Sequence, residues 1–299
     1  MIVFLNNKCK IIETKHVLKT MKHIAKLVFF LIFIIVDYGF LNPGEPPQTY
    51  VPLTKNPFEH VNKEWVDSVY NSMTLEQRIG QLFMVAAYTT PDQSNKQQIA
   101  ELITNYGIGG IIFMKGTPIN QVLYTNYFQS LSNVPLLVAI DGEWGLAMRL
   151  DSTISFPRQL MLGAVTDNKL IYEMGYEIGR QCKRMGIHVN FAPVVDINNN
   201  PNNPVINSRS FGELKHNVAV KGDYYMTGMQ DQGIITTAKH FPGHGDTDAD
   251  SHKSLPIIPH TKARLDSVEL YPFNYLIQRN LTGVMVAHLY IPEIDRTKN

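Results

Sequence analysis

The stretch Ile234-Ile235-Thr236-Thr237-Ala238 is followed directly by Lys239-His240-Phe241-Pro242-Gly243-His244-Gly245. The first run is apolar and β-branched, which predicts a short buried strand. The second run continues to His252 and holds three histidines, three aspartates and a lysine, and its proline and glycines exclude a regular helix. Titratable residues on an irregular loop at the end of a strand are typical of α/β enzymes.

The chain around this stretch alternates between extended and helical patterns. Apolar runs predict six strands, at residues 79–86, 108–114, 136–140, 189–197, 234–238 and 284–287. Helices are predicted at residues 95–106, 119–131, 167–184, 214–232 and 262–279. A capping-box pattern at Thr74 and Gln77 precedes the first strand. Strands that alternate with helices predict a parallel sheet, either doubly wound or closed into a barrel.

Polar residues at the strand ends separate these two folds. They lie at the C-terminal ends of different expected strands and are Asp141, Asp196, Lys239, His240 and His288. A barrel directs several strand ends to one site, whereas a doubly wound sheet favours a glycine-rich phosphate turn after its first strand. The glycine-rich run at residues 107–110 precedes a strand and does not fit such a turn. We therefore expect an α/β fold of the TIM (β/α)8 barrel type, incomplete, with about six of eight strands present.

The N-terminus carries the clearest compositional signal. Lys15, Lys19, Lys22 and Lys26 precede the apolar run at residues 27–36. A basic segment followed by a short apolar segment predicts an export signal. The apolar run is too short to span a bilayer core of about 30 Å as a stable helix. A buried core helix is the alternative interpretation of the run, but nothing amphipathic surrounds it.

These signals predict the domain organisation. Residues 1–41 are expected to be an export signal or signal-anchor, residues 42–56 a proline-rich linker, and residues 57–299 the barrel domain. The protein is therefore expected to be exported, and either periplasmic or anchored to the membrane through residues 27–36. The second alternative stays open because no small-residue cleavage site follows Val36.

Composition excludes several other classes of protein. The 299 residues carry a formal charge of only +1, which gives no reason to expect nucleic acid as a partner. Cys9 and Cys182 are too few for a disulfide framework or a zinc cluster. Cys182 lies in a helical pattern and is expected to be a small buried hydrophobe. The sequence does not define an oligomeric state.

The loop after Lys239 allows more than one chemistry. The spacing Asp246-x-Asp248-x-Asp250 invites a calcium-loop interpretation, but that loop needs glycine and glutamate where this chain has Ser251 and Ile257. A transition-metal site formed by three histidines is a second alternative, comprising His240, His244 and His252. The third is acid–base chemistry, because Asp250 lies two residues from His252 and a carboxylate beside an imidazole stabilises the imidazolium.

Four ordered segments, within residues 73–295, resemble the signature of glycoside hydrolase family 3 in its β-N-acetylhexosaminidase (N-acetylglucosaminidase) branch. They are Asp141-Gly142-Glu143-Trp144-Gly145 with Arg149, Asn207-Ser208-Arg209-Ser210-Phe211-Gly212, Lys239–Gly245 with Asp250-Ser251-His252, and Met285-Val286-Ala287-His288. The resemblance implies the family's N-terminal barrel domain, no cofactor and no metal. It implies hydrolysis of terminal β-linked N-acetylglucosamine from glycans such as peptidoglycan fragments, with a retaining mechanism.

The resemblance also implies roles for individual residues. His252 would be the acid/base and Asp250 its partner, which differs from the usual pair of glycosidase carboxylates. The N-acetylglucosamine would be bound by charged groups that form strong hydrogen bonds to hydroxyls. These substrate-binding residues would be Asp141, Arg149, Arg209, Lys239 and His240.

Two positions depart from the family pattern. The family's nucleophile is an aspartate after the seventh strand, and no residue of this sequence can be matched to it. Trp144 stands where glycine is more usual. We therefore expect a chain truncated at its C-terminus that is inactive alone. The alternatives are a non-catalytic fragment or pseudoenzyme that binds N-acetylglucosamine glycans, and a metal-dependent hydrolase that uses the histidines.

Overall fold

A computed structural model of the chain describes residues 61–89, 93–250 and 254–296. The chain divides into two compact units, Met1–Val51 and Pro52–Asn299, and every described residue belongs to the second. None of the described helices is long and apolar enough to cross a membrane. The expected export segment at residues 27–36 lies outside the described residues, so export and anchoring stay predictions.

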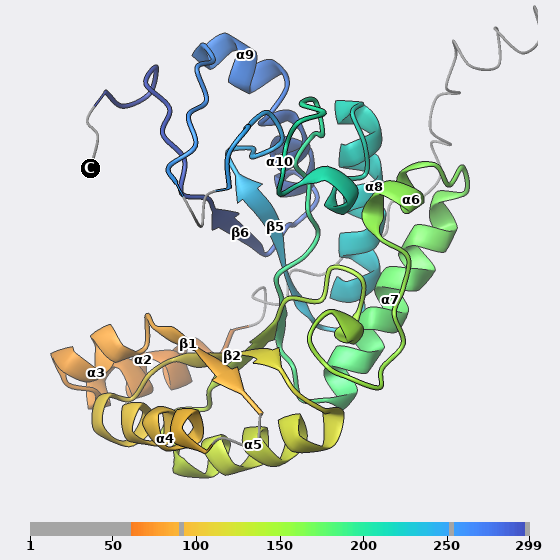
Figure 1. The fold of residues 1–299 in the computed structure, drawn as a ribbon. Coiled ribbons are helices and arrows are strands. Elements are labelled where there is room, and N and C mark those ends of the chain that lie inside the picture. The colour runs from red at the N-terminus through yellow and green to blue at the C-terminus, as the bar shows by residue number, and fades with distance from the viewer. Residues whose placement is uncertain (1–60, 90–92, 251–253, 297–299) are drawn as a thin grey trace, which may run out of the picture. The chain divides into compact units, whose positions relative to one another are not determined.

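Six parallel strands form one sheet in sequence order (Figure 1). They are β1 (Met84–Tyr88), β2 (Gly110–Lys115), β3 (Leu137–Ile140), β4 (Val189–Asn190), β5 (Ile235–Phe241) and β6 (Gly283–Val286). Parallel neighbours in sequence order, joined by helices, are the arrangement of a TIM barrel. Among the described residues β1 and β6 form the two edges of the sheet, so the barrel is open between them.

Helices connect the strands. They are α2 (Lys63–Ser72), α3 (Leu75–Gly80), α4 (Ser94–Tyr106), α5 (Pro118–Leu131), α6 (Gln159–Gly163), α7 (Asn168–Arg184), α8 (Lys215–Gln230), α9 (Lys262–Ser267) and α10 (Tyr271–Ile277), with 3-10 turns η1 (Leu146–Met148) and η2 (Asn207–Arg209). In Figure 1, α4 and α5 lie beside β1 and β2, and α7 runs along α8. The close approach of α7 and α8 needs glycine, because a Cβ on Gly175 or Gly228 would lie 2.3 or 2.2 Å from a carbonyl oxygen of the other helix.

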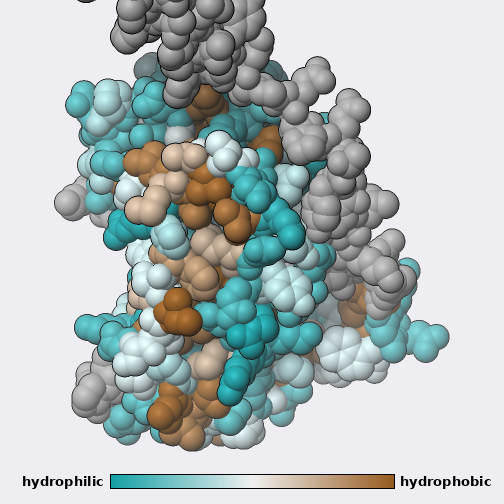
Figure 2. Space-filling view, turned by 90° about the vertical axis from the view of Figure 1, so that its right-hand side faces the viewer, coloured by the Kyte–Doolittle hydropathy of each residue, from teal (hydrophilic) through white to brown (hydrophobic). Residues whose placement is uncertain are grey.

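The core lies between the sheet and these helices. Strand residues Ile111, Phe113 and Val138 and helix residues Phe128 and Ile178 are completely buried. Each fully buried side chain of this size contributes about 1.5–3 kcal/mol relative to leaving it exposed. Cys182 belongs to the same core, as expected, and burial raises the pKa of its thiol to about 12. Figure 2 shows the face at the right of Figure 1, where apolar residues lie between polar ones.

Most of the expected elements are confirmed, with boundaries shifted by a few residues. Asp167 caps α7 by accepting a hydrogen bond from the Lys169 amide at 3.0 Å. The capping box at Thr74 and Gln77 is also present. It begins helix α3, which continues to Gly80, so the prediction of a strand over residues 79–86 was wrong for its first half. A helix begun by a capping box continued into the apolar run that had been assigned to the strand.

Two further expected elements are shorter than predicted. The strand expected at residues 189–197 pairs only over Val189–Asn190, because Pro193 has no N–H to give to a ladder. Val194 forms an isolated bridge with Lys239 instead. The helix expected at residues 262–279 is divided into α9 and α10. Pro272 lies in the first turn of α10, a position that proline tolerates, whereas it would break the interior of one long helix.

Candidate active site

A cavity of about 610 Å³ opens at the C-terminal ends of the strands. It is lined by Asp141, Glu143, Trp144, Met148, Arg149, Phe191, Val205, Arg209, Lys239, His240, His244, Met285, Ala287 and His288, among others. Every residue that the sequence predicted to bind the sugar lies in this lining. The prediction that strand ends and their loops converge on one site is therefore confirmed for these residues.

Oppositely charged side chains form a continuous chain of contacts along the cavity wall. Asp141 accepts hydrogen bonds from Arg149 at 2.6 Å and from Lys239 at 2.8 Å, through different oxygens. Lys239 also lies 2.8 Å from Glu143. Arg209 then holds both oxygens of Glu143, at 2.7 and 2.9 Å, in the forked geometry that guanidinium and carboxylate groups favour.

These contacts keep the buried carboxylates ionised. Burial by itself would raise the pKa of Glu143, but Lys239 and Arg209 outweigh it and lower that pKa to about 2. Burial likewise opposes ionisation of Asp141, and Lys239 and Arg149 outweigh it, so that its pKa is also lowered. Both carboxylates are therefore charged at neutral pH.

His240 is held in one tautomer by two neighbours. Its backbone N–H and its ring Nδ1 both reach Asp196, with Nδ1 at 2.6 Å from Oδ2. Its Nε2 lies 3.2 Å from the Arg209 guanidinium, which can only donate. Nε2 is therefore the acceptor and Nδ1 carries the proton. Burial would raise the pKa of Asp196, but His240 and the His244 amide outweigh it and lower that pKa.

Two buried side chains, Asn190 and Tyr225, hold the loop after β3 in place. The Asn190 amide accepts a hydrogen bond from Gly142 N at 2.8 Å and donates one to Gly142 O at 3.2 Å. The Tyr225 hydroxyl donates to the carbonyls of Gly142 and Glu143, each at 3.1 Å. A loop held at both its N–H and its C=O groups keeps the neighbouring carboxylates in place before a ligand arrives.

Exposure separates the groups that a ligand can reach from those that support them. The side chains of Asp141, Arg149 and Arg209 are 14%, 22% and 20% exposed, whereas those of Glu143 and Lys239 are only 1% and 3% exposed. Lys239 is thus occupied in holding two carboxylates, and a direct contact between Lys239 and the sugar stays a prediction. Three cations and three anions (Arg149, Arg209, Lys239; Asp141, Glu143, Asp196) sum to zero, which suits a neutral, hydroxyl-rich ligand.

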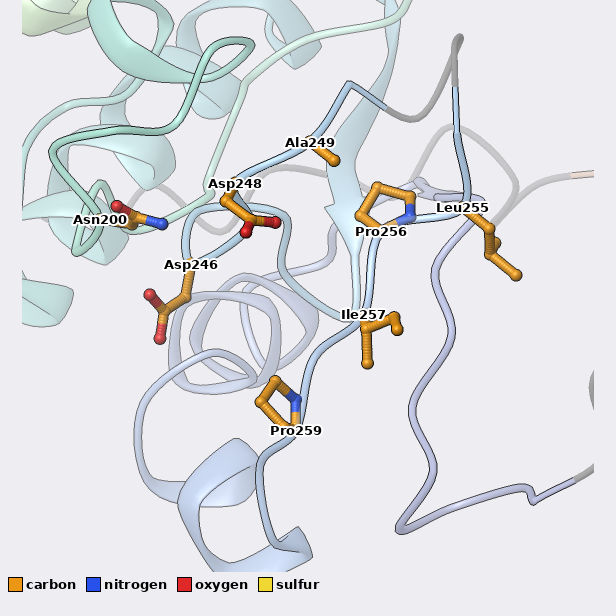
Figure 3. A pocket seen from close by; sticks show the side chains of 8 residues that line it. All are labelled: Asn200, Asp246, Asp248, Ala249, Leu255, Pro256, Ile257 and Pro259. Atoms are coloured by element: carbon orange, nitrogen blue, oxygen red, sulfur yellow. The ribbon is translucent and has the colours of Figure 1, made fainter.

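The loop with the expected acid/base is described in part. Asp250 is half-buried and its carbonyl accepts from Ser254 N, whereas His252 lies outside the described residues, so their pairing stays a prediction. The base of the loop is held by Asn203, whose amide donates to the His244 carbonyl at 2.7 Å. A second pocket of about 440 Å³ lies on this loop, with Asn200, Asp246 and Asp248 across from Pro256 and Ile257 (Figure 3).

Among the described residues, histidine and carboxylate side chains that could bind a metal ion lie close together at one place. Ligand atoms of Asp246, His260 and Glu269 lie within 4.8 Å of one another. Asp246 accepts a 2.6 Å hydrogen bond from His260, and Arg264 lies 3.1 Å from Glu269. The arginine already supplies positive charge beside the carboxylates, so these groups form an ion-pair network across the base of the loop. The cluster includes none of the histidines of the transition-metal alternative.

Sequence reasoning gave no role to Glu143, Asp196 or Asn190. A signal existed for the first two, because Glu143 lies in the Asp-Gly-Glu segment and Asp196 lies at the C-terminal end of the strand expected at residues 189–197. Asn190 carried no such signal, since one asparagine within an apolar strand has no distinctive spacing. These three residues position the groups that the sequence did identify.

Comparison with known proteins connects this geometry to a family. A protein-family model described as the glycosyl hydrolase family 3 N terminal domain matches residues 74–299. Beta-hexosaminidase A of Pseudoalteromonas piscicida is 38% identical over 215 residues, which cover 67% of this chain and 36% of that protein. Beta-hexosaminidase LpqI of Mycobacterium tuberculosis is 32% identical over 200 residues, covering 64% of this chain and 50% of that protein.

A solved structure agrees with these matches. The glycoside hydrolase family 3 beta-N-acetylglucosaminidase from Paenibacillus sp. str. FPU-7 superimposes with a TM-score of 0.70 and 41% sequence identity. The match covers 76% of this chain and 44% of that protein. The chain thus spans about half or less of the length of these relatives.

Proposed function

Because the chain belongs to glycoside hydrolase family 3, we propose that its cavity binds a terminal β-linked N-acetylglucosamine and that the protein serves in hydrolysis of the bond to it. The observation that carries this proposal is the fixed wall of three cations and three anions, in which the side chains of Asp141, Arg149 and Arg209 are reachable from the cavity. Relatives named beta-hexosaminidase support the same sugar.

Binding follows from the geometry of the wall. Asp141 already accepts from two cations, yet each carboxylate oxygen can accept again, so it can take hydrogen bonds from sugar hydroxyls. Arg149 and Arg209 have unused N–H groups that can donate to hydroxyl or acetamido oxygens. Because the groups are held by one another before the sugar arrives, little rotamer entropy is lost on binding.

The proposed chemistry places proton transfer on the loop after β5. His252 would protonate the leaving oxygen and later take a proton from water, with Asp250 orienting its ring. A retaining mechanism also needs a carboxylate nucleophile, for which the sequence offers no matched residue. Peptidoglycan fragments are the glycans that we propose as the substrate, in keeping with the expected export of the chain.

Calorimetric titration with N-acetylglucosamine tests the binding step. The protein should bind the sugar, and Asp141→Asn should weaken binding at least about tenfold, because hydrogen bonds to a charged group exceed those to a neutral amide. Asp266→Asn is the matched control, since Asp266 is exposed and paired only with its helix neighbour Lys262. Absence of saturable binding by the unmodified protein would refute the proposal.

Turnover assays test the chemical step. Where hydrolysis is measurable, His252→Ala should slow substrates with poor leaving groups about 10²–10⁴-fold and activated aryl glycosides far less. Equal losses on both substrates would point to a structural role. Activity abolished by a chelator and restored by zinc would instead favour the metal-dependent alternative.

A second candidate function is non-catalytic binding of N-acetylglucosamine glycans. Sugar binding without any turnover of aryl β-N-acetylglucosaminides would support it over the enzyme.

A further inference from the structure

One side of the cavity carries an aromatic ring with a cation on its face. Trp144 follows Glu143 in the loop after β3, is half-buried, and contributes to the cavity lining. The guanidinium carbon of Arg158 lies 4.4 Å from the centre of the Trp144 ring. Such stacking orients a guanidinium while leaving its N–H edges free to donate.

Arg158 is fixed in this position by the loop that also carries Arg209. Its NH1 group donates to the Ser208 hydroxyl at 3.1 Å. Its neighbour Gln159 is buried, with its side-chain amide between the Arg209 carbonyl and the Val194 N–H. Arg158 also precedes α6, and its carbonyl accepts hydrogen bonds from the Met161 and Leu162 amides of that helix. The two loops therefore share one rigid contact at the edge of the cavity.

Among the described residues, no carboxylate balances the charge of Arg158. Among the described carboxylates none forms an ion pair with it, although the cations inside the cavity each contact at least one. The inner wall sums to zero charge, so Arg158 adds one positive charge outside a neutral site. A pre-oriented, exposed guanidinium without a carboxylate is complementary to an anionic group of a ligand.

We propose that Trp144, Arg158 and Ser208 form a subsite for the leaving-group sugar of the substrate, and that Arg158 selects leaving groups that carry a carboxylate. The inference rests on the proposed function, because it needs a β-N-acetylglucosamine in the neutral inner site. The indole offers a flat apolar surface to the C–H face of the next sugar ring. The sugar would stack on the face of the indole that Arg158 does not cover, and the N–H groups of the guanidinium would reach an acidic substituent on that sugar past the rim of the indole.

Binding measurements can test this subsite directly, because the chain has only two tryptophans, Trp65 and Trp144. Trp65 is 53% exposed on α2, so Trp65→Phe leaves Trp144 as the sole fluorescent reporter with little effect on the fold. The probes are N-acetylglucosamine, its β-1,4-linked disaccharide with N-acetylmuramic acid, and the methyl ester of that disaccharide. The ester removes the charge of the acid and adds one methyl group, so Arg158→Ala, which removes the partner of the charge, separates the effect of charge from that of size.

The acid should bind about fivefold more tightly than the ester, which is the size expected for one ion pair that is partly open to solvent. Arg158→Ala should bring the two affinities together, and Arg158→Lys should restore part of the difference. Arg184→Ala is the matched control, because it removes an exposed arginine in the last turn of α7 and should leave the preference intact. Raising the salt concentration should shrink the preference. Where a probe is hydrolysed, the same ratio is measured as kcat/KM.

Trp144→Ala, followed by calorimetry, should weaken the ester and weaken the acid still more, because it removes the stacking surface and also the ring that orients Arg158. Equal affinities for the acid and the ester in the parent protein would overturn the inference, and so would a preference that survives Arg158→Ala. Failure of the parent to bind N-acetylglucosamine at all would instead refute the proposed function. The two failures are therefore distinguishable in one titration series.

Discussion

Replacing Lys239 with methionine should destabilise the protein strongly, because Lys239 is the buried cation between Asp141 and Glu143. Methionine keeps most of the volume and removes the charge. A pKa of about 2 for Glu143, against its ordinary 4.5, corresponds to about 3 kcal/mol of stabilisation of the folded state. Lys239 is the largest of the influences that lower this pKa, and removing one partner of a buried pair typically costs about 3–5 kcal/mol. We therefore expect a loss of about 3 kcal/mol at pH 7.

The pH dependence of this loss has a definite sign. The pKa of Glu143 is lower in the folded state, so its stabilisation is complete above about pH 4.5 and is lost as the pH falls toward 2. Protonation also neutralises the buried carboxylates that the variant leaves with fewer partners. The difference in stability between Lys239→Met and the parent should therefore narrow below about pH 4.5.

Urea unfolding followed by circular dichroism, at a series of pH values, measures both effects. Lys183→Met is the control, because Lys183 is exposed in the last turn of α7 and should change stability by less than about 0.5 kcal/mol. A loss below about 1 kcal/mol for Lys239→Met would refute the reasoning, since it would fall in the range of surface ion pairs. A difference that widened at low pH would refute it equally.

Three other predictions concern binding, packing and export. Arg209→Lys should weaken N-acetylglucosamine binding at least about tenfold by calorimetry, because lysine cannot hold both oxygens of Glu143, and unchanged affinity would contradict this. Gly243→Ala should lower the free energy of unfolding by about 3 kcal/mol, and Gly233→Ala should lower it by about 1 kcal/mol. Both glycines have positive φ, but only a Cβ on residue 243 would lie 2.8 Å from the Glu269 side chain. Equal losses of stability would count against the argument. A fusion of residues 1–50 to a periplasmic reporter should leave the cytoplasm, and a reporter that stays inside would show the export prediction to be wrong.

The position of the site could be predicted because it depends on chemistry that is written locally. Lys239 and His240 directly follow the apolar run at residues 234–238 and lie in the last residues of β5, and a parallel barrel leaves such residues at one end of the sheet. Asp141 follows β3 for the same reason. No contact between these residues had to be known, because the direction of the strands alone brings them to the same end.

The boundaries of elements were less predictable because they depend on competing local signals. At residues 75–80 a capping box and an apolar run favoured different structures, and the capping box decided the outcome. Pro193 ended the pairing of β4, although the residues beside it are apolar and β-branched. The partners of Glu143 could not be read from its neighbours either, because Lys239 and Arg209, which hold its 1% exposed side chain, are distant in sequence.

The contact between Asp141 and Lys239 carries information about the fold itself. The two residues are 98 positions apart and belong to the ends of β3 and β5, which are separated by β4. In a flat sheet, two strands that are separated by a third lie about 9.6 Å apart, and their side chains on the same face of the sheet point in parallel directions. In a barrel, alternate strands direct side chains into the same interior layer, so the ends of β3 and β5 converge. The 2.8 Å ion pair between Asp141 and Lys239 fits this convergence, which brings the carboxyl ends of β3 and β5 to the same cavity.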